Sequence, residues 1–354
     1  MTVLNTWVPV GPKQGAAEEA YVQCDFCLPP RLGFGERTGA AFRDWRFDDF
    51  EAGPHRCPWC AKVTDGVRLW PEEPHPALPN LLVIGAAKCG TSALHRYLSL
   101  HPDIFMPEVK ELKFFQDPNC LNRLEAYAAA FDGSVPVRGE ATPIYTCHPL
   151  LPGVPERIRE AVPDVKLIYL VRDPVERAIA TYVEAVVEES ETRDIEEAFR
   201  YPDDPFNVYT AQSRYASQYE QFARCFPPEQ ILVIEQTDLL ERRLDTLRRV
   251  FRFLEVDDDF SSPGFEDRVN TRDSKVRRTA LGKSLRTTRL AHAVRGMSPG
   301  ARDALLRPAR RLTSSPIAHP EPSDELRRRL SAALRGEVER LRGLTGVSVA
   351  TPSG

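Results

Sequence analysis

Residues 81–98 constrain the fold of this chain more than any other stretch. Four apolar residues, 81–84, stand between Pro79 and Gly85, and this pattern is typical of a buried strand. After a short loop, apolar residues recur at the spacing of one helical face, at Ala93, Leu94, Tyr97 and Leu98. The stretch therefore predicts a strand, a tight loop and a helix.

The loop between this strand and helix has the composition of an anion site. It carries small residues, Lys88, and the hydroxyls of Thr91 and Ser92. A phosphate needs exposed backbone N–H groups, a cation and the positive end of a helix. In an ATP-type P-loop the lysine directly follows the last glycine, whereas Lys88 precedes Gly90 by two residues. The loop predicts a phosphate-type ligand and argues against an ordinary NTPase.

The pattern of strand followed by helix continues along the chain. Residues 165–171 form a second apolar run, followed by Arg172-Asp173-Pro174 and a helical pattern. Residues 231–235 predict a third strand, and residues 244–254 an amphipathic helix. We also expect an acidic helix over 188–200 and a closing helix over 325–344. This alternation predicts an α/β fold, a P-loop-like parallel sheet flanked by helices.

The two strand–loop–helix segments resemble the signatures of sulfotransferases that use 3'-phosphoadenosine 5'-phosphosulfate. The resemblance implies that the 5'-phosphosulfate is held by Lys88, Cys89, Gly90, Thr91 and Ser92. It assigns the 3'-phosphate to Arg172, which can bind two phosphate oxygens, and to a serine eight residues later. Here that position is Ala180, so we expect the neighbouring Thr181 to replace the serine; the alternative is a more loosely held 3'-phosphate.

Residues 107–115 resemble the segment of the glycosaminoglycan sulfotransferase branch that supplies a glutamate base. The resemblance makes Glu111 the general base, with Glu108 as the rival, and lets Lys113 stabilise the moving sulfonate. A positioned carboxylate is useful because an acceptor hydroxyl has a pKa far above 7. Phe114 and Phe115 are expected to form an apolar wall beside it.

Two further segments extend the resemblance to roughly residues 80–347. Residues 138–145 are similar to a Glu-Lys-Thr-Pro-x-Tyr segment of the same families, but Ala141 replaces the lysine, which weakens the case for a highly anionic polysaccharide. Glu140 is expected to assist the base, to orient Lys113 or to form a structural salt bridge. In the basic stretch 272–312, Arg277 and Arg278 are expected to contact the 3'-phosphate or sulfate.

Four of the eight cysteines form two C-x-x-C pairs: Cys24, Cys27, Cys57 and Cys60. Such pairs can present four thiolates to a structural zinc ion, and the few aromatic residues between them would support a fold poorly without a metal. Two redox dithiols, or a module that has lost its metal, are the alternatives. We expect a flexible lead-in (1–22), a small N-terminal zinc-ribbon-like module (23–69), a proline-rich linker (70–79), a sulfotransferase domain (80–347) and a tail (348–354).

Composition and charge limit the binding partners and the cellular location that we expect. The net charge of −4 gives no general attraction to nucleic acid. No apolar run is long enough for a signal peptide or a membrane span, and scattered cysteines suit a reducing compartment. We expect a cytoplasmic, bacterial-type enzyme without a transmembrane segment, with the zinc module available to a protein partner.

The resemblance implies transfer of a sulfuryl group from 3'-phosphoadenosine 5'-phosphosulfate to a hydroxyl of a carbohydrate, lipid or natural-product acceptor. No catalytic metal is expected, since positioning and charge neutralisation by lysines can supply the catalysis. The alternatives are a P-loop kinase or NTPase that acts on a small molecule, and a nucleic-acid-binding protein that uses the zinc module. The first alternative requires ATP and magnesium; the second requires strongly salt-dependent binding.

Overall fold

The computed structural model describes residues 77–267 and 321–349 in full, together with the backbone of six short strands elsewhere. Those strands pair into three antiparallel sheets of two: β1 (Glu19–Gln23) with β2 (Leu32–Glu36), β3 (Arg46–Phe47) with β4 (His55–Arg56), and β10 (Arg277–Arg278) with β11 (Ser314–Ser315). The predicted zinc ligands, Cys24, Cys27, Cys57 and Cys60, lie outside the described residues, as do the side chains of Arg277 and Arg278.

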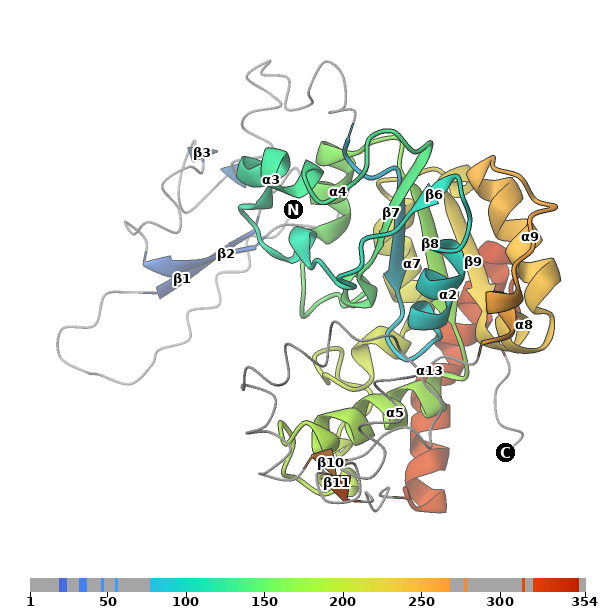
Figure 1. Ribbon diagram of the computed structural model, residues 1–354. Coiled ribbons are helices and arrows are strands. Elements are labelled where there is room, and N and C mark those ends of the chain that lie inside the picture. Colours follow the sequence, from blue (N-terminus) through green and yellow to red (C-terminus); the bar gives the residue numbers. More distant parts are fainter. Residues whose placement is uncertain are drawn as a thin grey trace.

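A five-stranded parallel sheet forms the centre of the molecule (Figure 1). Its order is β6 (Ile104–Phe105), β7 (Val137–Ala141), β5 (Leu81–Gly85), β8 (Lys166–Val171) and β9 (Ile231–Glu235). In its register, Leu82 lies opposite Glu140 on one side and Leu167 on the other. The strands predicted at 81–84, 165–171 and 231–235 are confirmed. Their apolar runs fit a parallel sheet, whose strands are typically buried on both faces.

Helices surround this sheet (Figure 1). The α-helices are α2 (Thr91–Leu98), α3 (Leu124–Ala128), α4 (Val154–Ala161), α5 (Pro174–Val187), α6 (Ile195–Ala198), α7 (Tyr215–Ala223), α8 (Gln236–Glu241), α9 (Arg243–Leu254) and α13 (Asp324–Thr345). Short 3-10 helices are η2 (Phe114–Gln116), η3 (Cys120–Arg123), η4 (Pro143–Tyr145), η5 (Ala211–Ser213), η6 (Pro228–Gln230) and η7 (Pro263–Glu266). The helices predicted at 244–254 and 325–344 are confirmed as α9 and α13.

Helix α13 brings the C-terminal part of the described chain back onto α5 and α7. Its apolar residues recur every four positions at Leu326, Leu330 and Leu334, and all three are fully buried. They join a core with α5 residues such as Ile179. Glu337 then accepts hydrogen bonds from the N–H and the hydroxyl of Ser217 at 2.8 and 2.7 Å, which fixes α13 against α7.

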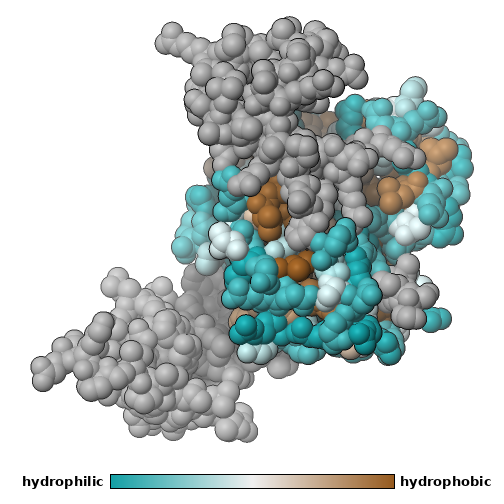
Figure 2. All heavy atoms as spheres, turned by 90° about the horizontal axis from the view of Figure 1, so that it is seen from below, coloured by the Kyte–Doolittle hydropathy of each residue, from teal (hydrophilic) through white to brown (hydrophobic). Residues whose placement is uncertain are grey.

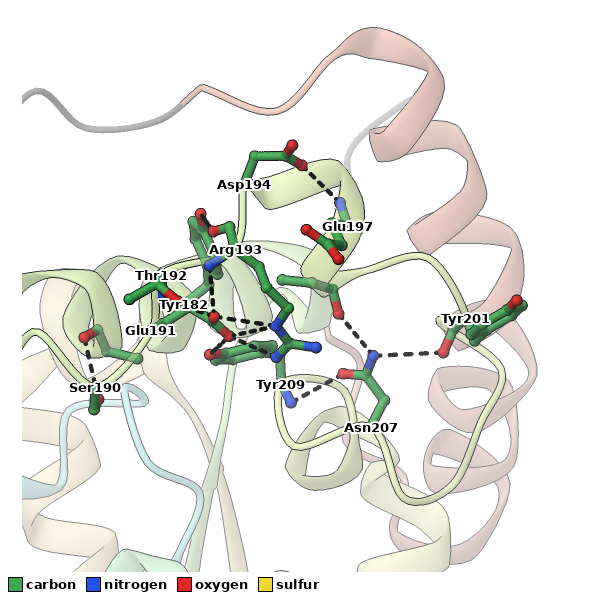
Figure 3. Close-up of polar contacts among 12 residues, drawn as sticks. Tyr182, Ser190, Glu191, Thr192, Arg193, Asp194, Glu197, Tyr201, Asn207 and Tyr209 are labelled. Atoms are coloured by element: carbon green, nitrogen blue, oxygen red, sulfur yellow. Dashed lines mark hydrogen bonds and ion pairs between the residues drawn. The ribbon is translucent and has the colours of Figure 1, made fainter.

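The acidic stretch 188–200 is mostly not helical, contrary to our prediction. Helix α5 ends at Val187, and only Ile195–Ala198 is helical after it. The Glu191 carboxylate accepts bonds from the backbone N–H groups of Thr192 and Arg193, from the Arg193 guanidinium and from the Tyr209 hydroxyl (Figure 3). These local bonds from backbone N–H groups to a side chain take the place of helical hydrogen bonds.

The described helices and surface were compared with what a membrane span requires. Among the residues that the structure describes, no helix combines the length and apolar character that crossing a bilayer requires. Figure 2 shows one face, on which the described surface is mostly hydrophilic and carries hydrophobic residues in a few separate patches.

Candidate active site

The carboxyl ends of the parallel strands bring the predicted donor residues together. Strand β5 ends at Gly85, β8 at Val171 and β9 at Glu235. Because parallel strands end at the same edge of a sheet, the loops that follow them meet there, which is where α/β proteins usually bind ligands. Three elements therefore converge at this edge: the phosphate loop (residues 86–90), Arg172 and Gln236.

Contacts from three other elements hold the phosphate loop in place. The Lys88 carbonyl oxygen accepts from the Arg172 guanidinium at 3.1 Å and from the Gln236 amide at 3.4 Å. The Ala87 N–H donates to the Gln212 side chain at 3.0 Å. Lys88 and Gly90 have positive φ angles of 70° and 95°, and Gly90 meets that requirement without strain.

Some backbone N–H groups of the loop donate hydrogen bonds within the protein, and others lie in the first turn of a helix. The N–H of Ala86 donates to Leu170 and that of Cys89 to Ala86. Helix α2 begins after Gly90, and no side chain caps it. The first N–H groups of a helix have no intrahelical acceptor, so those of Thr91 and Ser92 are suited to an anion.

Lys88 and Cys89 have opposite environments. The Lys88 amine forms an ion pair with Glu184 of α5, and the two side chains are 19% and 37% exposed. Cys89 is fully buried, with its sulfur 3.7 Å from the Tyr215 hydroxyl. Burial raises the pKa of the Cys89 thiol to about 11, which favours the thiol over the reactive thiolate near neutral pH.

Arg172 stands between β8 and α5, as predicted. Its backbone N–H faces the Tyr215 hydroxyl at 3.4 Å, while its guanidinium reaches Lys88. The next residue, Asp173, caps α5 by accepting from the N–H groups of Val175 and Glu176 at 2.8 and 2.9 Å. Burial raises the pKa of Asp173, and these two bonds oppose the rise.

Thr181 is engaged with a buried arginine that the sequence analysis missed. The Thr181 hydroxyl donates to the Arg177 carbonyl oxygen at 3.1 Å and accepts from the Arg177 guanidinium at 3.2 Å. Arg177 is fully buried and also donates to the Ser213 hydroxyl at 2.5 Å and to the Tyr209 carbonyl oxygen. A charged residue on the apolar face of the predicted helix was the available signal.

The predicted acceptor segment follows β6. Glu111 and Lys113 both have left-handed backbone conformations, with φ angles of 65° and 57°. The Glu111 carboxylate accepts from the Lys110 amine at 2.8 Å, and its side chain is 37% exposed. The segment is also held to α2, because the His95 ring lies 3.1 Å from the Pro107 carbonyl oxygen.

Phe114 and Phe115 pack into the core. The Phe114 ring stacks on Tyr127 with centroids 3.9 Å apart, and the buried Phe115 ring meets Tyr127 and Tyr145 edge-on. The apolar wall expected beside Glu111 stays a prediction, since the contacts of these rings are with Tyr127 and Tyr145. The rings anchor the segment, and the charged Lys110 is the neighbour that the structure shows for Glu111.

Glu140 is the central residue of a buried network under this segment. It is 1% exposed and accepts from the hydroxyls of Tyr145, Tyr127 and Thr142 at 2.7, 2.8 and 3.0 Å. Burial raises the pKa of Glu140, while bonds from these hydroxyls and from the Leu112 N–H oppose the rise. The partners shown for Glu140 are thus hydroxyls and a backbone amide.

The same hydroxyls hold the backbone of the acceptor segment. Thr142 accepts from the Lys113 N–H at 3.3 Å, and the Tyr145 hydroxyl accepts from the Phe115 N–H at 3.2 Å. Of the roles expected for Glu140, this geometry favours orienting Lys113, through its backbone. The structure thus brings Lys88 and Arg172 into direct contact and places the Glu111 segment against the end of β7, beside β5.

No cluster of three or more His, Cys, Asp or Glu residues suited to a metal occurs within residues 77–267 and 321–349. The four cysteines proposed as zinc ligands are outside these ranges.

Comparisons with known proteins agree with this fold and site. Residues 78–275 match the model of the sulfotransferase domain, and the chain therefore belongs to this family. Heparan sulfate glucosamine 3-O-sulfotransferase 5 of Mus musculus is 29% identical over 192 residues, which cover 51% of this chain and 54% of that protein. Heparan sulfate glucosamine 3-O-sulfotransferase 6 of Mus musculus is 30% identical over 231 residues, or 57% of this chain and 64% of that protein. The chain thus spans less than two thirds of these relatives.

Among solved structures, a sulfotransferase from Alicyclobacillus acidocaldarius matches with a TM-score of 0.54 and 27% identity, over 77% of this chain and 97% of that chain. This match supports the α/β sulfotransferase fold. The prediction of a sulfotransferase is confirmed at the level of the family.

Proposed function

We propose that this chain transfers a sulfuryl group from 3'-phosphoadenosine 5'-phosphosulfate to an acceptor hydroxyl. The observation that carries the proposal is the junction of the two signature segments, where Arg172 contacts Lys88 at the carboxyl edge of the sheet. In this arrangement Lys88, Cys89, Gly90, Thr91 and Ser92 surround the 5'-phosphosulfate, through the lysine, the hydroxyls and backbone N–H groups. The Arg172 guanidinium takes the 3'-phosphate.

Thr181 completes the 3'-phosphate site in this proposal. Its hydroxyl lies on α5, beside the Ala180 position that lacks a serine, and it can turn from the Arg177 carbonyl oxygen toward a phosphate oxygen. Arg277 and Arg278 are proposed to add positive charge from the part of the chain that follows residue 267.

The proposed chemical step is an in-line displacement at the sulfur atom of the donor. The acceptor oxygen attacks sulfur, and a new S–O bond forms as the bond from sulfur to the bridging oxygen breaks. The electron pair leaves with adenosine 3',5'-bisphosphate, whose developing charge Lys88 neutralises. Glu111 takes the hydroxyl proton, and Lys113 stabilises the sulfonate in transit. Such a step gains chiefly from positioning and from preorganised charge.

The names of the relatives support a choice of acceptor class. The curated relatives are named for a glucosamine of heparan sulfate, which favours a carbohydrate hydroxyl, with a lipid or a natural product as the other choices. The described cysteines are free thiols, which suits the proposed cytoplasmic location. The zinc-ribbon-like module is proposed to help the chain fold or to contact a protein partner.

A transfer assay tests this function. The chain is incubated with the donor and a panel of sugar, lipid and phenol acceptors, and release of adenosine 3',5'-bisphosphate is followed. We expect at least one acceptor to be sulfated, with loss of about 10²–10⁴-fold in kcat in Glu111→Gln, the usual contribution of a general base. Glu108→Gln is the matched control and should retain activity. Equal loss in both variants would contradict the assignment of Glu111.

A further inference from the structure

Helix α5 presents a carboxylate to the phosphate loop. The Glu184 carboxylate contacts the Lys88 amine, and both side chains are partly buried. In the proposed function, Lys88 neutralises the negative charge that develops on the departing phosphate. The cation of the donor site is therefore paired with an acidic side chain of the same chain.

The position of Glu184 on α5 makes this contact part of the donor site. Glu184 follows Ala180 by four residues, so both lie on one face of the helix, one turn apart. Thr181 is three residues before Glu184 and borders the same face. This part of α5 therefore carries Ala180, Thr181 and Glu184, of which the Glu184 carboxylate contacts the loop.

A carboxylate here opposes an anionic ligand in two ways. It occupies the Lys88 amine, and it repels phosphate oxygens that approach the same amine, since like charges at short range disfavour one another strongly outside bulk water. A group that weakens binding equally in substrate and product lowers retention of the product bisphosphate. Affinity for the donor and the rate of product release are thus linked through one side chain.

We propose that Glu184 competes with the nucleotide for Lys88 and so sets the affinity of the donor site. This inference rests on the proposed function. Glu184 is in this view a positioning residue that acts through Lys88 and does not touch the reacting atoms.

The test is calorimetric binding of adenosine 3',5'-bisphosphate to wild type, Glu184→Gln and Glu188→Gln. The glutamine variant keeps the shape of the side chain and removes its charge. We expect it to bind the bisphosphate about tenfold more tightly, within the usual range for coupled sites, with the gain reduced at high salt. The control makes the same charge change at the exposed C-terminal end of the helix, and its affinity should equal that of wild type.

Unchanged or weaker binding in Glu184→Gln, with a thermal melt that matches wild type, would overturn this inference alone. Equal tightening in Glu188→Gln would also overturn it, because the effect would then be one of net charge. Failure of wild type and both variants to bind the bisphosphate would overturn the proposed donor itself.

Discussion

The Arg172 guanidinium donates a hydrogen bond to the Lys88 carbonyl oxygen over 3.1 Å, although the two residues are 84 positions apart in the sequence. This contact joins the loops after β5 and β8. It also brings Arg172, the residue predicted to bind the 3'-phosphate, beside the loop predicted to bind the 5'-phosphosulfate.

Arg172→Ala is expected to weaken binding of adenosine 3',5'-bisphosphate by about 1.5–3 kcal/mol, the usual worth of hydrogen bonds to a charged group. Arg172→Lys keeps the charge but loses the two-pronged geometry, so it should recover only part of the affinity. Titration calorimetry measures both. Full affinity in Arg172→Ala would remove Arg172 from the site.

Glu140→Gln tests the network under the acceptor segment. The amide nitrogen cannot accept the hydroxyl bonds that the carboxylate accepts, and one buried unpaired group costs about 1–3 kcal/mol of unfolding free energy. Because the network holds the backbone at Lys113 and Phe115, kcat should fall while the affinity for adenosine 3',5'-bisphosphate stays the same. Denaturant unfolding, calorimetry and the transfer assay report these effects separately; unchanged kcat would show that the network is structural only.

Glu191 makes a pH-dependent contribution to stability. Hydrogen bonds from Arg193 are the main reason that the pKa of Glu191 falls to about 2 from an ordinary 4.5. An acid whose pKa is lower in the folded state stabilises the protein above its unfolded pKa, and loses that contribution as pH falls from 4.5 toward 2. Because the Arg193 side chain is 47% exposed, solvent limits the effect to about 1 kcal/mol or less.

The measurement is the unfolding free energy of wild type and Glu191→Gln as a function of pH. The variant should be less stable at pH 7, and the difference should shrink as the pH is lowered below 4.5. A difference that does not change with pH would contradict an electrostatic role. Glu189→Gln, in the same loop, is the control for the loss of charge.

The cysteine pairs predict bound metal. The full chain should contain about one zinc ion per molecule, the content of a single four-cysteine site, and Cys24→Ala or Cys57→Ala should lose it. Elemental analysis of the purified chain measures the content, with Cys225→Ala as the control. An equal loss of zinc in the control, or a chain without zinc, would contradict the proposed module.

The sequence predicted best the parts of the fold that depend on local pattern. Strands β5, β8 and β9 are mainly apolar runs; Arg172 directly follows β8, and Lys88 lies in the loop that follows β5. Strand β7 was not recognised as a strand, because Arg138, Gly139 and Glu140 interrupt its apolar pattern. The buried Glu140 is tolerated only because hydroxyls from Tyr127 and Tyr145 reach it, and these contacts depend on the tertiary structure.

The supports of the donor loop were hidden for the same reason. Gln212 and Gln236 contact the loop from positions 125 and 148 residues away, and a glutamine in isolation carries no signal of such a role. The helix predicted over 188–200 failed for a different reason. Its acidic composition is compatible with a helix, but the hydrogen bonds of one carboxylate, Glu191, override that preference.

Calorimetric binding of adenosine 3',5'-bisphosphate, compared with ATP plus magnesium, tests the central claim most directly. It is carried out on wild type and on Lys88→Ala. The account predicts that wild type binds the bisphosphate in clear preference to ATP, and that Lys88→Ala weakens this binding. A preference for ATP, or no binding of either nucleotide, would contradict the proposed sulfuryl transfer.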